Sequence, residues 1–291
     1  MSNPVFLLMP QWQGSASSRA MRIADGAAVI REDLPPRSTV DIAVPLEAGD
    51  AMGTPIARLS SLLSARDAAR DALERTAGPH ILVGGDGSTA VAGIEWAVRT
   101  HGADGLAVLW CDAHAGLEHP STSPTGAAAG MALRHVLGVG EPELSSRAPA
   151  SAARVSLLGT RATAPDEDAE ITQLGISRMA APAAEEAAAF ADRISAHLSA
   201  SGATRLYVHV DLDVLDPAEF SAVHATVPFG LGVTHLTSAI RAAVAALPLA
   251  GATITEFAPA DAHAAADDLP TVLRILGALT SGGSGAAGAA A

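Results

Sequence analysis

Short apolar runs that alternate with alanine-rich stretches constrain the fold of this 291-residue chain more than any other feature. The runs are rich in Val, Leu and Ile and lack polar alternation, which is typical of parallel strands covered on both faces. The alanine-rich stretches between them have the length and composition of helices. Strands that alternate with helices predict βαβ units, so we expect an α/β fold with a central, mainly parallel, doubly wound sheet.

The expected elements follow directly from this pattern. The predicted strands span residues 5–8, 39–44, 80–83, 106–111, 154–158, 205–211 and 252–256. The predicted helices span residues 56–75, 89–100, 126–137, 181–200, 234–246 and 268–279. Thr234 and Asp268 are the expected N-caps of the last two helices. Since no linker divides the chain, we expect one domain over residues 1–280 and a disordered Gly/Ser/Ala tail over residues 281–291.

Charge and composition argue against several classes of protein. The net charge of −13 disfavours nucleic acid and anionic membranes as partners, because both attract basic surfaces. No apolar stretch approaches the roughly 20 residues that span a bilayer. The N-terminus lacks the basic segment of a signal peptide, and the single cysteine, Cys111, excludes an intrachain disulfide. We therefore expect a globular cytoplasmic protein that acts on a small molecule.

Two polar motifs directly follow predicted strands and are typical of metal ligands. In HVDLDVLDP, Asp211 and Asp213 lie two residues apart and share one face of the strand end. In LWCDAHAG, Asp112 and His114 offer a carboxylate and an imidazole. This mixture suits Mn²⁺ or Zn²⁺ better than Mg²⁺ or Ca²⁺, which prefer oxygen ligands. For HVDLDVLDP the alternative interpretation is the capping of a loop by acidic side chains, and Asp112-x-His114 alone is a weak indication.

Two further motifs allow two interpretations each. The loop ILVGGDGSTA resembles the motif of NAD kinases and phosphofructokinases, and backbone amides at the start of a helix can hold a phosphate. The alternative is a tight turn in which Asp86 hydrogen-bonds neighbouring loops. In ITEFAPAD, Glu256 follows a strand, and its carboxylate can pair with a cationic group such as a guanidinium. The alternative for Glu256 is an ordinary surface position.

Taken together and in this order, the motifs resemble those of the arginase/agmatinase/formiminoglutamase (ureohydrolase) family. The family patterns GGDHS, DAHxD, SxDxDxxDP, E-x-x-P, GxxHGMxL and GxRxxDP are matched at residues 84–88, 112–116, 209–217, 256–259, 122–138 and 157–165. The resemblance implies a three-layer arginase-like fold and a metal-dependent hydrolase that acts on a C–N bond of a linear amidine. A kinase motif accounts for one of these six segments and is the weaker interpretation.

The departures from the family patterns bear on the metal site. The resemblance implies two Mn²⁺ ions, but the His of GGDHS and the second Asp of DAHxD, which help to hold one of them, fall at Gly87 and Gly116. The family's helix His falls at Ala129, and the acidic residue of the GxRxxDP loop falls at Ala164. Because two ligands are lost, we expect one Mn²⁺ ion, with Zn²⁺ as the alternative. The losses at Ala129 and Ala164 argue for a preferred substrate other than L-arginine.

The resemblance also assigns roles to individual residues. The expected metal ligands are Asp112, His114, Asp211 and Asp213. Asp112 and Glu256 are expected to be catalytic, and Glu256 and Arg161 to bind the substrate. Three residues of adjoining loops are candidates to replace a missing ligand: Glu118, His119 and His224.

Two functions remain in competition on this basis. One is a hydrolase that acts through a single metal ion on a guanidino or amidino compound. The other is a catalytically inactive pseudoenzyme that serves as a structural or regulatory subunit. Family members form trimers or hexamers, so the resemblance implies a homo-oligomer or a hetero-oligomer with an active paralogue.

Overall fold

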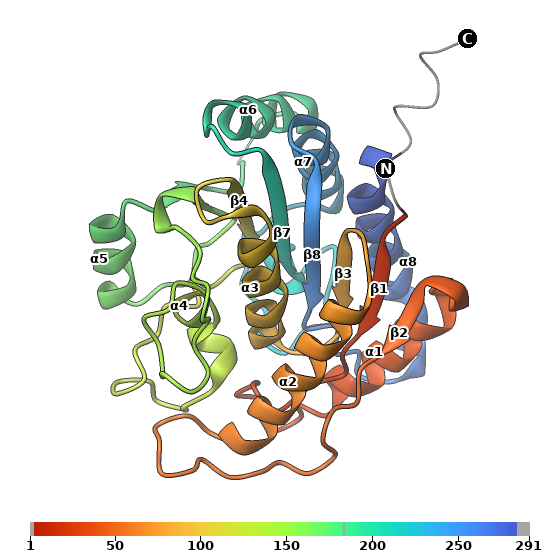
Figure 1. Cartoon of the computed structure of the whole chain (residues 1–291). Coiled ribbons are helices and arrows are strands. Elements are labelled where there is room, and N and C mark those ends of the chain that lie inside the picture. Colours follow the sequence, from red (N-terminus) through yellow and green to blue (C-terminus); the bar gives the residue numbers. More distant parts are fainter. Residues whose placement is uncertain (1–2, 183, 284–291) are drawn as a thin grey trace.

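Eight parallel strands form one sheet at the centre of the computed structural model, which describes residues 3–182 and 184–283 (Figure 1). The strands are β1 (Val5–Leu8), β2 (Thr39–Asp41), β3 (His80–Val83), β4 (Leu106–Cys111), β5 (Val155–Leu158), β6 (Ser177–Met179), β7 (Arg205–Asp211) and β8 (Leu249–Thr255). Their order across the sheet is β2-β1-β3-β8-β7-β4-β5-β6, and every neighbouring pair is parallel. The predicted parallel α/β sheet is confirmed.

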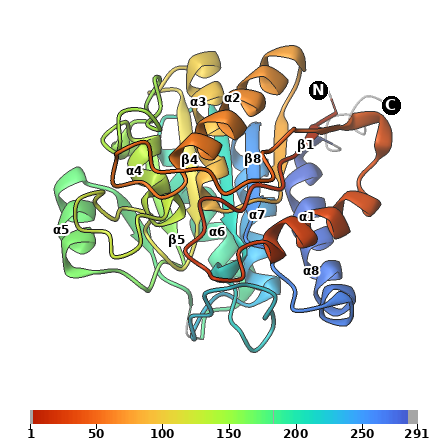
Figure 2. The same cartoon turned by 90° about the horizontal axis from the view of Figure 1, so that it is seen from below.

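Helices cover both faces of the sheet (Figures 1 and 2). They are α1 (Arg22–Asp33), α2 (Leu59–Arg75), α3 (Ala90–His101), α4 (Ala132–Val136), α5 (Pro165–Leu174), α6 (Ala187–Ala200), α7 (Val233–Ala246) and α8 (Ala262–Thr280). Side chains of α2, α3 and α4 pack on one face of the sheet, and those of α1, α6, α7 and α8 pack on the other. The fold therefore has the three layers that the sequence pattern predicts.

Strand β4 shows why the central runs are apolar at every position. Trp110 and Val108 pack into the core beneath α3 and α4, whereas Leu109 and Cys111 pack into the core beneath α6 and α7. Successive side chains of a strand point to opposite faces, and here both faces are covered. The same alternation directs Tyr207 of β7 toward α3, because a Cβ on Gly93 of that helix would meet the Tyr207 hydroxyl.

Both predicted helix caps are wrong. Helix α7 begins at Val233 with Gly232 as its N-cap, and α8 begins at Ala262, where the Asp261 carboxylate accepts hydrogen bonds from the first amides. The Asp268 carboxylate instead accepts hydrogen bonds from backbone amides of the loop before α7. Pro270 lies inside α8, where it has no backbone N–H to donate to the preceding turn.

Other differences concern short or irregular elements. Helices α1 and α5 and strand β6 were not predicted, and the predicted helix 126–137 forms as a 3₁₀ turn, η3 (Ala128–Met131), followed by α4. The first residues of the predicted tail form another 3₁₀ turn, η6 (Ser281–Gly283), and residues 284–291 lie outside the described part of the chain. Within the described ranges, no helix is long and apolar enough to cross a membrane.

Candidate metal centre

Three neighbouring strands bring acidic residues to one edge of the sheet. Asp211 is the last residue of β7, Asp112 directly follows β4, and Glu256 directly follows β8. Strands β8, β7 and β4 are adjacent and parallel, so their carboxyl ends lie side by side. Figure 2 views the molecule from this side. Parallel α/β sheets bind their ligands at this edge.

Backbone hydrogen bonds hold the acidic loops against each other. Asp211 accepts a hydrogen bond from the Asp213 amide at 3.1 Å, which forms the tight turn η5 (Leu212–Val214) after β7. Asp213 Oδ1 accepts from the amide of Ala113 at 3.0 Å, and this bond links the β7 loop to the β4 loop. The His114 amide donates to Asp112 Oδ1 at 2.7 Å. Each carboxylate therefore has a fixed direction before any ligand binds.

Two groups of candidate metal-ligand atoms result, and within each group all atoms lie within 4.8 Å of one another. The first group contains Asp112, His114 and Asp213, with His114 Nδ1 at 2.8 Å from Asp213 Oδ2. The second group contains Asp112, His209 and Asp211. The four predicted ligands are thus brought together, but they are divided between two groups that share Asp112.

His209 belongs to the centre although the sequence motifs did not single it out. It precedes Asp211 by two residues on β7, so both side chains leave the strand on the same face. The His209 ring is fully buried 3.9 Å from the Trp110 ring, and within the described residues neither ring nitrogen has a hydrogen-bond partner. Burial lowers the pKa of His209 to about 3, so the ring is neutral. The spacing His-x-Asp was the available indication.

Crowding of buried charges dominates the electrostatics. Burial and the neighbouring Asp211 raise the pKa of Asp112, and burial together with Asp112 raises the pKa of Asp213 to about 6. The pKa of Asp211 is also raised, by burial and by Asp213. Burial alone would lower the pKa of His114, but the two carboxylates beside it outweigh burial and raise that pKa to about 11. A protonated His114 and a bound cation are therefore alternative ways to compensate the charge of these carboxylates.

The donor set fits a divalent cation. Buried carboxylates that converge without Lys or Arg between them are stable when a cation lies among them. Within each group, two carboxylates and one imidazole face one another. Carboxylate and imidazole ligands together suit Mn²⁺ or Zn²⁺. The residues present are therefore compatible with the metal that the sequence motifs imply.

Glu256 lies beside these groups in a strained conformation. Its φ angle is 66°, which is uncommon for a residue with a Cβ, and its amide donates to the carbonyl of Gly85 at 2.9 Å. Its carboxylate accepts a hydrogen bond from the Gly87 amide, while burial and then Asp211 raise its pKa. Strained backbone of this kind is concentrated at functional sites, where the surrounding structure stabilises it.

A cavity of about 500 Å³ opens above the carboxylates. Its lining includes five acidic side chains and two imidazoles: Asp112, Glu118, Asp211, Asp213, Glu256, His114 and His224. Among the described residues that line it, none is Lys or Arg. The loop of residues 15–18 forms part of the wall, and Arg58 fixes this loop by donating to the carbonyl of Ser15 at 2.9 Å. Such a cavity favours small cationic ligands.

Comparison with known proteins agrees with this architecture. A sequence profile described as the arginase family matches residues 15–273. The chain belongs to the arginase family. It is 32% identical over 180 residues to an arginase of Agrobacterium fabrum (strain C58 / ATCC 33970), an alignment that covers 57% of this chain and 53% of that protein. It is 27% identical over 271 residues to the N(omega)-hydroxy-L-arginine amidinohydrolase of Streptomyces lavendulae, which covers 90% of this chain and 92% of that protein.

Solved structures of the arginase family share the fold. The arginase of Entamoeba histolytica in complex with L-ornithine superposes with a TM-score of 0.81 at 18% identity, covering 96% of this chain and 97% of that one. The proclavaminate amidino hydrolase of Streptomyces clavuligerus gives a TM-score of 0.68 at 22% identity, covering 96% and 92%. At these identities the likeness shows the fold of this arginase-family chain and does not identify its substrate.

Among the arginase-family motifs, the GGDGS loop is held by hydrogen bonds to its own aspartate, Asp86. The buried carboxylate of Asp86 accepts hydrogen bonds from the amides of Ser88 and Gly14, and from the side chain of Gln11. The Ser88 amide at the helix start is therefore already bonded to a side chain of the same loop. This arrangement matches the tight turn rather than the phosphate-binding interpretation.

Arg161, the predicted substrate-binding residue of the GxRxxDP loop, is placed outside the cavity lining. Its guanidinium donates to backbone carbonyls that include those of Asp213 at 2.9 Å and Val227 at 2.7 Å. Arg161 thereby ties its own loop to the segment that follows β7. In this position it supports the loop that carries Asp213.

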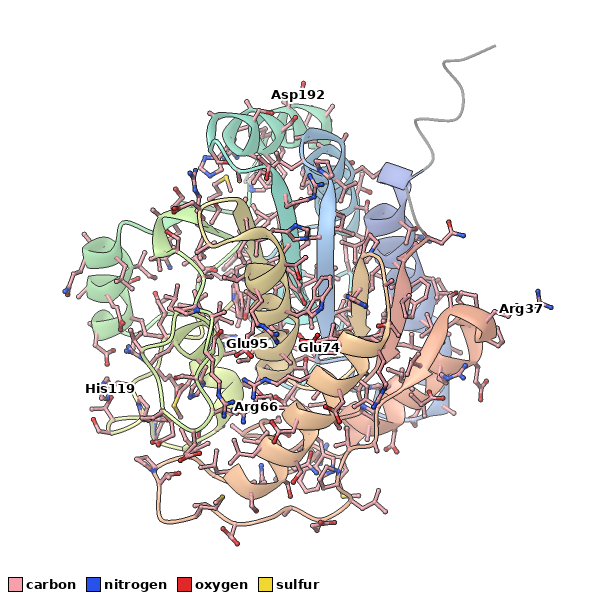
Figure 3. The ribbon with its side chains drawn as sticks, in the orientation of Figure 1. Arg37, Arg66, Glu74, Glu95, His119 and Asp192 are labelled. Atoms are coloured by element: carbon pink, nitrogen blue, oxygen red, sulfur yellow. The ribbon has the colours of Figure 1, made fainter. Side chains whose placement is uncertain are left out.

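The three loop residues considered as replacement ligands differ in position. Glu118 and His224 line the cavity, and Ser123 Oγ donates to Glu118 Oε2 at 2.6 Å. His119 is exposed at the outer edge of the molecule and hydrogen-bonds Ser121, 2.8 Å away (Figure 3). Neither Glu118 nor His224 belongs to the ligand groups that the described residues form.

Proposed function

We propose that this arginase-family chain is a metal-dependent hydrolase that cleaves a C–N bond of a small guanidino or amidino compound. The observation that carries the proposal is the group Asp112, His114 and Asp213, which lies in one cavity with the carboxylate of Glu256. A metal site and a partner for a guanidinium are the two parts that such a reaction needs. Both lie at the strand ends where α/β folds bind their ligands.

Each residue has a defined task in this proposal. Asp112, His114 and Asp213 would hold a Mn²⁺ or Zn²⁺ ion, which supplies Lewis acidity and a water of lowered pKa when bound. Glu256 accepts the guanidinium or amidinium through its carboxylate, for which a planar cation is the natural bidentate partner. Arg161 keeps the Asp213 loop in place through its bonds to backbone carbonyls.

The cavity restricts the class of substrate. Glu118 and Glu256 are both part of the lining, which offers no Lys or Arg among its described residues to a carboxylate of the ligand. Anionic side chains attract cations and repel anions at short range. We therefore expect cationic guanidines or amidines without a carboxylate to be better substrates than L-arginine.

The experiment is a hydrolysis screen of the Mn²⁺-loaded full chain against guanidino and amidino compounds, with release of urea or amine as the readout. Asp213→Ala should abolish activity, because it removes one carboxylate of the ligand group. Asp192→Ala is the matched control, since Asp192 is exposed on α6 at the opposite end of the sheet (Figure 3). A metal-loaded protein that hydrolyses none of these compounds would favour the alternative of an inactive subunit.

A further inference from the structure

We propose that His209 is a metal ligand and that, together with Asp112 and Asp211, it forms a second cation site beside the first group. The inference rests on the proposed metal centre but is independent of the proposed reaction. It assigns a chemical task to a buried imidazole that the first ligand group does not use. It also changes the expected number of ions from one to two per chain.

The distances support this assignment. The ligand atoms of Asp112, His209 and Asp211 lie within 4.8 Å of one another. Bonds of about 2.0–2.2 Å to one ion place two ligand atoms at most about 4.4 Å apart, so small side-chain rotations would complete the site. Asp112 belongs to both groups, and a carboxylate with two oxygens can bridge two ions.

Hydrogen bonding leaves the imidazole available. Trp110 Nε1 donates to Asp112 Oδ2 at 3.2 Å, and Thr255 Oγ1 donates to Asp211 Oδ2 at 3.3 Å, so both carboxylates are oriented by neighbours. The two nitrogens of His209 are buried and have no such partner within the described residues. A buried polar group is normally satisfied by a partner, and a metal ion can be that partner.

His209 can also take the place of a histidine of the family pattern that this chain lacks. The imidazole that the GGDHS pattern would supply is absent, because Gly87 stands in its place. The missing Cβ of Gly87 would face Asp211 and Ala129. His209 reaches the same carboxylate from within β7 rather than from the loop after β3. One imidazole is thus lost on the loop, and another is present on the strand.

Metal content of the full-length chain tests the proposal. After Mn²⁺ loading and removal of free metal, elemental analysis should give two ions per chain for the natural protein and one for His209→Leu. His135→Leu is the matched control and should retain both ions. His135 is equally buried, but it belongs to neither ligand group. His114→Ala should retain one ion, in the second site.

Electron paramagnetic resonance gives a readout that does not depend on activity. Two Mn²⁺ ions bridged by Asp112 should be magnetically coupled, and His209→Leu should leave the signal of an isolated ion. Circular dichroism and thermal unfolding check that the variant folds, and His209→Met, whose thioether is a poor ligand for Mn²⁺, serves as the second variant if it does not. One ion or none in the natural protein, or two ions in a folded His209 variant, would overturn the proposal. If the protein hydrolyses a substrate but binds only one ion, the proposed function stands and the second site is excluded. If it binds two ions but hydrolyses none of the compounds, the second site stands and the proposed function fails.

Discussion

A Cβ atom on Gly87 would lie 3.7 Å from Oδ2 of Asp211 and 3.8 Å from the Cβ of Ala129. These are ordinary van der Waals distances, and Gly87 does not have a positive φ angle. A side chain at position 87 therefore fits without backbone strain and points at the second cation site. We expect Gly87→His to restore a second Mn²⁺ ion in the His209→Leu background, because it supplies an imidazole to the same carboxylate. Elemental analysis of the double variant measures the effect.

The specificity of this rescue has a direct control. Gly87→Leu fills the same space without a ligand atom, so in the His209→Leu background it should leave one ion per chain. If Gly87→His and Gly87→Leu give the same metal content, a side chain at position 87 does not contribute a ligand to the second cation site. Thermal unfolding of both variants without metal separates loss of binding from loss of the fold.

Gly116 differs from Gly87 in a way that predicts a different outcome. Its φ angle is +68°, and a Cβ there would lie 3.1 Å from the amide nitrogen of Leu133. Gly175, the C-cap of α5, has a φ angle of +67° with nothing within 4 Å. An alanine at either position is destabilised by about 1–2 kcal/mol, because its Cβ is disfavoured in the left-handed backbone conformation. Only Gly116→Ala adds overpacking, which costs about 1–3 kcal/mol.

Urea unfolding of the two alanine variants measures this difference. Gly116→Ala should be the less stable variant, by roughly the overpacking contribution. Equal stabilities would show that the backbone around Gly116 can move at little cost. The prediction implies that Gly116→Asp alone is a poor route to an additional metal ligand, because the loop must first shift away from Leu133.

The parts of the fold that sequence predicted well are those buried on both faces. The ranges predicted for β3, β4 and β7 agree with the observed strands, because uninterrupted apolar runs of this length are too short for a buried helix. Strand β6 escaped prediction because it is a three-residue edge strand that contains the exposed Arg178. Helix α1 escaped prediction although Ile23, Ala27 and Ile30 recur at helical spacing and are buried.

The site was predicted in part for the same physical reason. Motifs that follow parallel strands meet at one edge, so Asp112 and Asp211 come together whatever the loops do. His209 was not predicted, since a histidine within an apolar strand is usually a core residue. The carbonyl contacts of Arg161 were not predicted either, because they join loops more than 50 residues apart in sequence. Such contacts depend on tertiary packing, which local patterns do not encode.

The strained backbone of Glu256 predicts an unusual order of stabilities. In most positions alanine is more stable than glycine, because glycine loses more backbone entropy on folding. At Glu256 the φ angle of 66° reverses this order, since the left-handed region disfavours a Cβ by about 1–2 kcal/mol. We expect Glu256→Gly to be more stable than Glu256→Ala by about 1 kcal/mol in urea unfolding.

An ordinary helical position provides the comparison for Glu256. Asp192 lies on the exposed surface of α6, where Asp192→Ala should be more stable than Asp192→Gly by about 1 kcal/mol. The same order of stabilities at both positions would contradict the assigned backbone strain. Both Glu256 variants should also lose hydrolytic activity under the proposed function, because neither retains the carboxylate.

The buried His135 predicts a loss of stability in mild acid. Burial, with a smaller contribution from the nearby Arg134 and Arg66, lowers its pKa in the folded chain to about 4. The unfolded chain has a histidine pKa of about 6.5, so it takes up the proton first as the pH falls. His135 therefore lowers the free energy of unfolding as the pH falls from about 6.5 to about 4, by at most about 1.4 kcal/mol per pH unit.

His135→Leu should remove this contribution to the pH dependence. Urea unfolding of the metal-free chain at pH 7 and pH 5 should show a smaller loss of stability for the variant than for the natural protein, by about 2 kcal/mol. Metal-free protein is used because protonation of the ligand groups would otherwise release the cation over the same range. His80 and His209 are buried in both proteins, so their contributions cancel in the comparison. Parallel pH profiles for the two proteins would mean that His135 takes up its proton as easily in the folded chain as in the unfolded one.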